Sequence, residues 1–359
     1  MRGKERILAS LKGQECDHVS WAPVVDRYFT SSLPAQGYPE VSVPNAIRLM
    51  GADIMERHVP TLRTIEHSSI QRRVVREGDL ERTTWETPVG CLVEDRRWAP
   101  WVSTHVTKFP VATPEEMKIY QYIVEHTSYE ENYATFREHE RLIGDDGIGT
   151  SSGPLSPLAN LLEEVCGVEQ TYYLLTDATA VVESCLETMH ESYKQMYRLM
   201  AEGPSVAIFD YEDTSSTIIS PALYGMYCAP YLDEYARICH AAGKLYITHM
   251  CGKLSAFNEQ LRAGEMDGID SVCPPTTGDI WAHEARQAWG ASKLIIGGTE
   301  PSALERMSVA ETRTYVRQVL DLMPTFRGFI LSTGDATAHG TPLANLRAVS
   351  EVAAACPWK

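Results

Sequence analysis

The chain has 359 residues, a formal net charge of -16 and a hydrophobic content of 44%. An excess of negative charge this large excludes nucleic acid and anionic membranes as main partners, because both repel acidic surfaces. The length and the hydrophobic content suit a single domain over residues 1–359, since α/β barrels reach this size undivided.

Strands and helices are predicted to alternate along the whole chain. The first segment, MRGKERILASLKGQ, predicts a basic amphipathic helix rather than a signal peptide, because it lacks an apolar stretch. Short apolar, β-branched runs predict strands at Val19–Val25, Ile54–His58, Leu142–Ile148, Val206–Tyr211, Leu245–Met250, Ile269–Cys273, Leu294–Gly297 and Phe329–Ser332. Longer periodic patterns predict helices at Ala178–Met200, Pro221–Ala242, Val309–Met323 and Leu343–Ala355. This order predicts an α/β fold, a parallel (β/α)₈ TIM barrel. The alternative, a doubly wound open sheet, is disfavoured because no GxGxxG follows the first strand.

One stretch interrupts the alternation. Between Arg72 and Arg97, apolar and polar residues alternate around Gly and Asp turn signals. This pattern predicts a β-hairpin insertion of about residues 71–103 after the second strand. We expect the insertion to shape the barrel mouth rather than to form a separate domain.

The cysteines indicate a reducing compartment. There are nine, and they are scattered without the even, close spacing of a secreted disulfide scaffold. No run of about 18 apolar residues occurs, so no membrane contact is expected. We therefore expect a cytoplasmic protein with thiols free to bind metal.

Polar and metal-capable side chains follow the predicted strands. In a barrel the chemistry lies at the carboxyl ends of the strands. Those ends carry Asp26, Tyr28, His58, Asp145, Asp146, Asp210, Glu212, Asp213, His249, Cys251, Cys273, Glu300, Asp335 and His339.

The segment KLYITHMCGK carries the strongest metal signal. A strand of period two sends His249 and Cys251 to the same side, and an imidazole with a thiolate suits tetrahedral zinc. The alternative is a buried thiol beside a hydrogen-bonded histidine. Upstream, Asp213 and Cys228 are further candidates, with a helix-capping aspartate and a core cysteine as the alternatives.

Several segments together resemble the uroporphyrinogen decarboxylase superfamily, which includes cobamide-dependent methyltransferases. They are GADIMERH, the SSGPLSP loop, SPALYGMYCAPY with CHAAGKLYITHMCG, GGTEPSAL, and LSTGDATAHGTPLANLRAV. The resemblance implies a barrel of these eight strands with an open mouth.

Two branches of the superfamily fit in part. Uroporphyrinogen decarboxylases carry an arginine-rich loop near the first strand, whereas WAPVVDRYFTSSLP has only Arg27. Coenzyme M methyltransferases bind zinc with an HxC pair and a cysteine in the last strand loop. This chain keeps His249 and Cys251 but has Asp335 at the late position.

A third branch, the methyltransferases that begin corrinoid-dependent O-demethylation, is similar in spacing. Their zinc motif is Glu, fourteen residues, Glu, twenty residues and His, and Asp213, Cys228 and His249 reproduce that spacing with both glutamates changed. The resemblance implies zinc held by these three residues, with Cys251 a fourth ligand or a close neighbour.

The expected function is therefore a zinc-dependent methyltransferase. It would move a methyl group from a small O-methyl donor, an aryl methyl ether, to Co(I) of a corrinoid (cobalamin). The chain has no DxHxxG-type corrinoid loop, so we expect the corrinoid on a partner protein. Three alternatives stay open: methyl transfer from a methylcobamide to a thiol, a metal-free decarboxylase, and a barrel that binds without turnover. The decarboxylase would need converging arginines, of which only Arg27 and Arg57 are evident.

The remaining mouth residues are candidates for handling the substrate. Asp26, Tyr28 and Asp146 are expected to act beside His249 in catalysis. Substrate contacts are expected from Trp21, His58, Ser151, Gly153, Tyr227, Asp335 and His339. For each, an ordinary core, loop or salt-bridge role is the alternative. A homodimer is common for such barrels and is an open expectation here.

Overall fold

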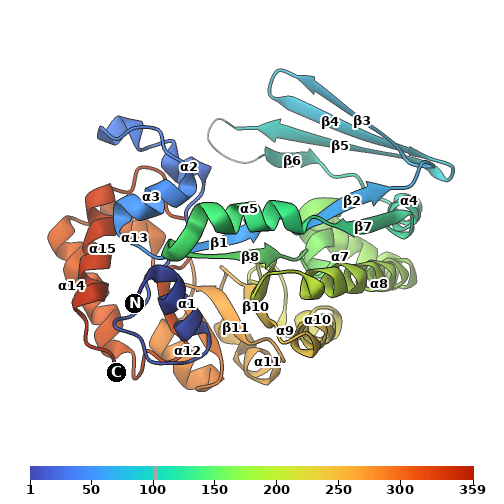
Figure 1. Ribbon diagram of the computed structural model, residues 1–359. Coiled ribbons are helices and arrows are strands. Elements are labelled where there is room, and N and C mark those ends of the chain that lie inside the picture. Colours follow the sequence, from blue (N-terminus) through green and yellow to red (C-terminus); the bar gives the residue numbers. More distant parts are fainter. Residues whose placement is uncertain (100–103) are drawn as a thin grey trace.

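Seven parallel strands form a curled sheet at the centre of the protein (Figure 1). The computed structural model describes residues 1–99 and 104–359. Neighbouring strands in the sheet follow chain order: β1 (Ile54–Val59), β8 (Gly147–Ser152), β9 (Ala207–Tyr211), β10 (Leu245–His249), β11 (Gly268–Val272), β12 (Leu294–Thr299) and β13 (Phe329–Thr333). Every pairing is parallel, which requires a crossover between successive strands.

The first predicted strand, Val19–Val25, is reduced to a single bridge between the two ends of this sheet. Trp21 forms a parallel bridge with Leu331 of β13, and its carbonyl accepts a hydrogen bond from Asp53 N just before β1. Pro23, two residues after Trp21, has no N–H to donate, so a regular ladder cannot continue. The result is a TIM-barrel-like fold with seven regular strands.

Helices cover the outside of the sheet. The longest ones carry apolar stripes that pack against the strands in one large core, because a strand buried on both faces needs a helix on its outer side. The helices are α2 (Arg27–Thr30), α3 (Val43–Met50), α4 (Pro114–Glu125), α5 (Tyr133–Ile143), α6 (Pro157–Asn160), α7 (Val168–Asp177), α8 (Thr179–Glu202), α9 (Pro221–Tyr227), α10 (Ala229–Ala241), α11 (Asn258–Ala263), α12 (Ala282–Trp289), α13 (Pro301–Arg306), α14 (Val309–Leu322) and α15 (Leu343–Ala355).

The amino-terminal helix, α1 (Gly3–Leu11), closes one end of the curled sheet. Ile7 and Leu11 of this helix are buried in a cluster with strand residues that include Met55, Phe209 and Ile247. The helix contacts β8 and β13 at the ends where these strands begin. The loops that carry the predicted site lie at the opposite end, where the strands finish.

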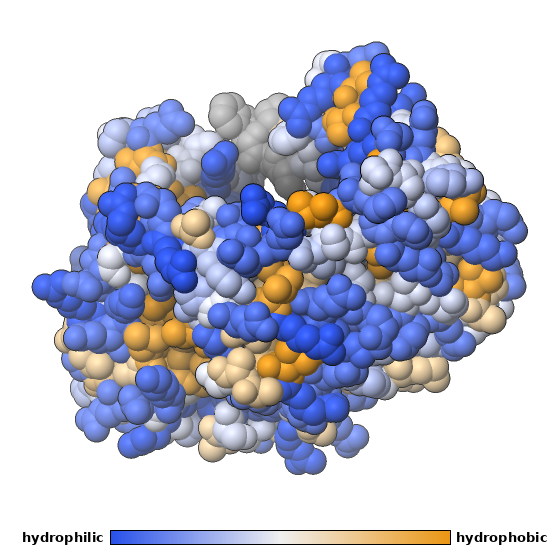
Figure 2. All heavy atoms as spheres, turned by 45° about the vertical axis from the view of Figure 1, so that its right-hand side comes forward, coloured by the Kyte–Doolittle hydropathy of each residue, from blue (hydrophilic) through white to orange (hydrophobic). Residues whose placement is uncertain are grey.

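Residues 71–108 differ from the expected hairpin. They form a four-stranded antiparallel sheet of β3 (Gln71–Glu77), β4 (Leu80–Thr87), β5 (Gly90–Trp98) and β6 (Thr104–Lys108). Residues 100–103, the last part of the predicted insertion, lie outside the described residues. A two-stranded pair, β2 (Leu62–Glu66) with β7 (Thr127–Glu131), connects this sheet to the body. In Figure 2 the small sheet projects at the upper right from a largely hydrophilic surface.

Two predicted boundaries shift in the structure. The strand expected at Leu142–Ile148 begins only at Gly147, because α5 continues to Ile143 and a 3₁₀ turn follows. The helix expected at Pro221–Ala242 is broken at Cys228, where Pro230 removes a backbone donor from the next turn. Among the described helices, none is both long and apolar enough to cross a membrane.

Candidate functional site

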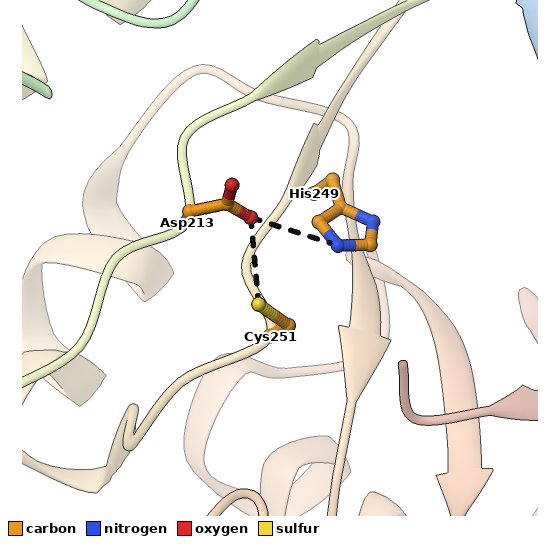
Figure 3. A group of neighbouring side chains, drawn as sticks. All are labelled: Asp213, His249 and Cys251. Carbon is orange, nitrogen blue, oxygen red and sulfur yellow. Dashed lines mark hydrogen bonds and ion pairs between the residues drawn. The ribbon is translucent and has the colours of Figure 1, made fainter. Parts of the chain in front are cut away.

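Three side chains with metal-binding atoms meet beyond the ends of β9 and β10 (Figure 3). One ligand atom from each of Asp213, His249 and Cys251 lies within 4.8 Å of the other two. Asp213 Oδ1 is 3.4 Å from Cys251 Sγ and 3.7 Å from His249 Nε2. Figure 3 shows the Asp213 carboxylate pointing between the imidazole and the thiol. Among the described residues, this is the group with donors close enough to share one ion.

The backbone fixes Asp213 against His249. His249 is the last residue of β10, and Asp213 lies two residues beyond β9. The amides of Glu212 and Asp213 both donate to the His249 carbonyl, at 3.0 and 3.1 Å. Asp213 has φ 42°, in the left-handed region that non-glycine residues adopt at a cost of about 1 kcal/mol or more. The two hydrogen bonds hold this conformation and bring the carboxylate to the imidazole.

Asp270 and Arg57 hold the other side of the imidazole. Asp270, in β11, accepts a hydrogen bond from His249 Nδ1 at 2.7 Å. Arg57, in β1, donates to Asp270 from Nε and from one terminal nitrogen, at 3.0–3.1 Å. All three side chains are buried, with Asp270 0% exposed. The imidazole is therefore oriented with Nδ1 toward Asp270 and Nε2 toward Asp213.

The charges around the site decide its protonation. Burial alone would raise the pKa of Asp270, but the Arg57 charge and the hydrogen bonds from His249 and Arg57 outweigh it, so this pKa lies below its ordinary value. An ionised Asp270 can only accept, which places the His249 proton on Nδ1. Burial would lower the pKa of His249, but the hydrogen bond and charge of Asp270, with Asp213 and Asp335, raise it. Burial and the charge of Asp213 raise the pKa of Cys251, so without a cation its thiol is protonated.

Cys228 lies outside this group of three. It follows the last residue of α9 as the C-cap and is 1% exposed, and its pKa is raised by burial and by the neighbouring Glu212. Glu212 in turn accepts from the amide and hydroxyl of Ser156, at 2.9 and 2.8 Å. Cys228 and Asp213 both line one very small cavity beside the site.

Several predicted mouth residues do lie at the carboxyl end of the sheet. The His58 ring, at the end of β1, stacks on Tyr211 at 4.1 Å, and Tyr211 contacts the His249 ring at 4.8 Å. Tyr28 stacks on His339 at 4.5 Å, joining α2 to the loop after β13. Asp335 lies in the same loop, and its pKa is raised by burial and by the charges of Asp213 and Asp270.

Other predicted residues have structural partners. Asp26 caps α2 by accepting from Phe29 N, and Ser151 shares a hydrogen bond with Thr61 at 2.5 Å. Gly153 packs against the Tyr197 ring, where no side chain fits. Trp21 is buried in the large core.

Two expected site residues lie elsewhere. Asp146 precedes β8, next to α1, and pairs with Arg48 at 2.7 Å on the surface, so its expected place at the mouth was wrong. The reason is the late start of β8, which leaves Asp146 at the opposite end of the strand. Tyr227 lies on α9 and donates to Glu183 on α8 at 2.9 Å, in the outer helix layer.

The cavities lie beside the site. One of 250 Å³ is lined by Asp26, Arg57 and His58 among others, between β1 and the α2–α3 segment. A larger cleft of 1170 Å³ adjoins it, with Arg27, Glu56 and Trp98 in its lining, and its described lining includes none of the three clustered donors. The described lining of the smaller cavity also lacks these three donors, but it includes Arg57 and His58, whose partners Asp270 and Tyr211 both contact His249.

The sequence profile of uroporphyrinogen decarboxylase (URO-D) matches residues 139–356, from α5 to the end of α15. This chain belongs to the uroporphyrinogen decarboxylase family. A methyltransferase from Methanosarcina mazei has a similar structure over 98% of both chains, with a TM-score of 0.64 and 16% sequence identity, which shows a shared fold. A putative vitamin-B12 independent methionine synthase from Listeria monocytogenes gives a TM-score of only 0.42 at 11% identity, over 94% of this chain and 95% of its own. No curated protein sequence matches the chain.

In this URO-D family member, Arg57 is not available to a substrate carboxylate. Besides Asp270, it donates to the carbonyls of Ala22, Pro23 and Met55 and to the Ser332 hydroxyl. These partners account for the guanidinium donors. Of the two arginines considered for decarboxylation, only Arg27 is exposed at the mouth.

Sequence reasoning missed Asp270 and misjudged Arg57. Asp270 is the one charged residue of the strand GIDSV, and Arg57 lies between Glu56 and His58 in IMERHV; both side chains are buried, and a buried charge needs a partner. The sequence shows a charged residue in each of these strands. It does not show that Arg57 and Asp270 pair with each other across the barrel.

Proposed function

We propose that this URO-D family member is a zinc-dependent methyltransferase that moves a methyl group from an O-methyl donor to Co(I) of a corrinoid carried by a partner protein. The observation that carries the proposal is the group of Asp213, His249 and Cys251 at the carboxyl end of the sheet. Carboxylate, imidazole and thiolate are all zinc ligands, and three protein ligands leave a position open, as in catalytic zinc sites.

The second reason is the orientation of His249. Its Nδ1–H is fixed by Asp270, which leaves the Nε2 lone pair facing Asp213 and Cys251. Metal-binding histidines commonly donate their other ring N–H to a carboxylate in this way. The donor set and its orientation thus fit the metal.

The reaction must separate a methyl group from a poor leaving group. In the proposed transfer the electron pair of the C–O bond would stay on oxygen, the Co(I) corrinoid as co-substrate would supply the pair that accepts the methyl group, and the oxyanion would take a proton from water. Zinc bound by the three side chains would supply Lewis-acid stabilisation of the charge that develops on the leaving oxygen. Because the group contains one thiol rather than two, its ligand set favours an O-methyl donor over activation of a thiol substrate.

The chain's other mouth residues would bind and shield the donor. The His58–Tyr211 stack forms an aromatic wall beside His249, and the 250 Å³ cavity at His58 and Asp26 is the proposed place for a small aryl ether. Asp335 lies in the loop after β13, where its pKa responds to burial and to the charges of His249 and Asp213, and it would contact the substrate. The Tyr28–His339 stack joins α2 to the loop after β13 at the border of this region.

The test combines metal content with methyl transfer. Wild-type protein, purified without added metal, is assayed for zinc beside His249→Ala. Both are then mixed anaerobically with Co(I) cobalamin and a panel of aryl methyl ethers, with formation of methylcobalamin followed by absorbance. Near-stoichiometric zinc and methylcobalamin in the wild type, both lost in His249→Ala, are the expected results. A wild type that binds no zinc after reconstitution would overturn the proposal.

A further inference from the structure

A buried chain of three side chains runs across the inside of the sheet and ends at the candidate metal ligand His249. It begins with Arg57 on β1, continues through Asp270 on β11, and reaches His249 on β10. The exposed fractions are 4% for Arg57, 0% for Asp270 and 5% for His249. Burying a charged group costs several kcal/mol per ion unless its hydrogen-bond partners compensate for the lost water. A buried series of charged side chains is therefore expected to have a structural or functional role.

In this series of three side chains, both Asp270 oxygens and all three Arg57 nitrogens take part in hydrogen bonds. Asp270 Oδ2 accepts from His249 Nδ1 at 2.7 Å, and both carboxylate oxygens accept from Arg57. The remaining Arg57 donors go to backbone carbonyls and to Ser332 on β13. Arg57 therefore fixes the carboxylate plane through Nε and one terminal nitrogen, and the carboxylate fixes the ring.

We infer that Asp270 and Arg57 are positioning residues that hold the His249 imidazole with Nε2 directed at the zinc position between Asp213 and Cys251. The inference rests on the proposed zinc site and deepens it. Neither residue is a metal ligand, because the Asp270 carboxylate lies on the Nδ1 side of the ring. Their effect is exerted through His249 alone.

The physical argument concerns the freedom of the ring. Without an acceptor at Nδ1, the imidazole gains alternative rotamers and the other tautomer, and metal binding must then restrict both. A preorganised ring avoids that cost. Arg57 contributes by keeping the carboxylate in one plane with a forked donor, which a lysine ammonium cannot reproduce.

The competing explanation is an ordinary buried ion pair that only stabilises the fold. The chain offers a matched control, the pair of Arg6 on α1 with Asp53 just before β1, at 2.5 Å and 8% and 7% exposed. Asp53 also accepts from a serine hydroxyl, Ser20, as Arg57 reaches Ser332 in the first pair. This pair lies at the end closed by α1, away from the donors.

The experiment compares wild type, Asp270→Asn, Arg57→Lys and Asp53→Asn. Each protein is stripped of metal, its thermal midpoint is measured, and zinc affinity is determined by competition with a chromogenic chelator. The stripped proteins are also loaded with Co²⁺, whose visible spectrum reports the ligand field. We expect Asp270→Asn to weaken zinc binding by about 10- to 100-fold and to change the Co²⁺ spectrum. Arg57→Lys should act in the same direction by a smaller factor, while Asp53→Asn loses stability and keeps the wild-type affinity and spectrum.

The outcomes separate this inference from the proposed function. If the wild type binds zinc and Asp270→Asn binds it equally well, the positioning role is overturned and the zinc site stands. If Asp53→Asn loses as much affinity as Asp270→Asn, the effect is one of stability and the inference also fails. If Asp270→Asn does not fold, the zinc affinity of Arg57→Lys is compared with those of wild type and Asp53→Asn, and the same outcomes test the positioning role. A wild type without zinc affinity overturns the proposed function itself.

Discussion

The sulfur of Cys251 lies 3.4 Å from the Asp213 carboxylate, although the two residues belong to different loops, 38 positions apart in the chain. This contact places Cys251, rather than Cys228, beside the other candidate ligands. Spacing in the sequence had favoured Cys228, because the fourteen- and twenty-residue intervals match the motif of O-demethylating methyltransferases. The geometry favours the nearer thiol.

The first prediction separates the two cysteines. Cys251→Ser should lower zinc affinity by about tenfold or more, since an alcohol is a much poorer zinc ligand than a thiolate. Cys228→Ser should keep the zinc and lower the free energy of unfolding by roughly 1–3 kcal/mol, because it buries a hydroxyl where a thiol fitted. Zinc titration and chemical unfolding of both variants measure this. Loss of zinc in Cys228→Ser with retention in Cys251→Ser would restore the spacing hypothesis.

A second prediction concerns the glycine that follows Cys251. A Cβ at Gly252 would lie 2.4 Å from both Ser215 Cβ and the Thr214 carbonyl, so Gly252→Ala must push the Cys251 loop away from the loop of Asp213. We expect a loss of about 1–3 kcal/mol in stability and weaker zinc binding, with every ligand still present. Zinc competition and thermal unfolding test it.

The matched control is Gly225→Ala in α9. A Cβ there meets nothing within 4 Å, and the position is exposed. Alanine should therefore leave zinc binding unchanged and stabilise the helix by about 0.5–1 kcal/mol. If Gly252→Ala also bound zinc as tightly as wild type, the close approach of the two loops would not matter for the site.

The sequence predicted the parts of the fold that depend on local pattern. The strands expected around Ile54, Val206, Leu245, Ile269, Leu294 and Phe329 coincide with β1 and β9–β13. Their apolar, β-branched runs suffice because parallel strands are buried on both faces. β8 was misplaced because GIGTSS has little strand propensity, and its glycine Gly147 is required by contact with Ile54 of β1.

The site was predicted in its chain-local part only. His249 and Cys251 lie at the end of one predicted strand, so their proximity follows from the two-residue period of a strand. Asp213 follows the end of the neighbouring predicted strand, so its proximity to His249 was expected as well. Asp270 and Arg57 are 213 positions apart, and nothing in a single sequence indicates that they meet. A fully buried strand also lacks the alternation that would show which residues point inward.

A third prediction concerns the stacked pair Tyr28 and His339. The stack joins α2 to the loop after β13, so each ring orders the segment that carries the other ring at the border of the proposed substrate region. Tyr28→Ala and His339→Ala should be non-additive, with a coupling of about 0.5–1.5 kcal/mol in the free energy of unfolding, and each should raise KM for the methyl donor. Tyr28→Phe, which keeps the stack, is the control and should behave as wild type. Additive effects in the double variant would show that the rings do not support each other.

The last prediction is a pH dependence of the metal-free protein. Burial, and then the negative charges of Asp213, Glu212 and Glu164, raise the pKa of Glu163 to about 8. The pKa in the unfolded chain is near its ordinary value of 4.5. Between these values the folded protein holds a proton that the unfolded chain has released, so the free energy of unfolding decreases as pH rises through this window. The contribution of protonated Glu163 to the free energy of unfolding is complete below about pH 4.5 and is lost toward pH 8 and above.

Glu163→Gln should remove this dependence, because glutamine resembles the protonated acid and cannot ionise. In chelator-treated protein, its thermal midpoint should exceed that of the wild type at pH 8.5, and the difference should shrink steadily toward pH 5. Glu169→Gln on α7 is the control, since Glu169 is exposed and its variant should follow the wild-type curve in parallel. A Glu163→Gln curve that also runs parallel to wild type would mean that Glu163 is solvated and ionised in the folded protein, and that the acidic side chains beside Asp213 do not repel it.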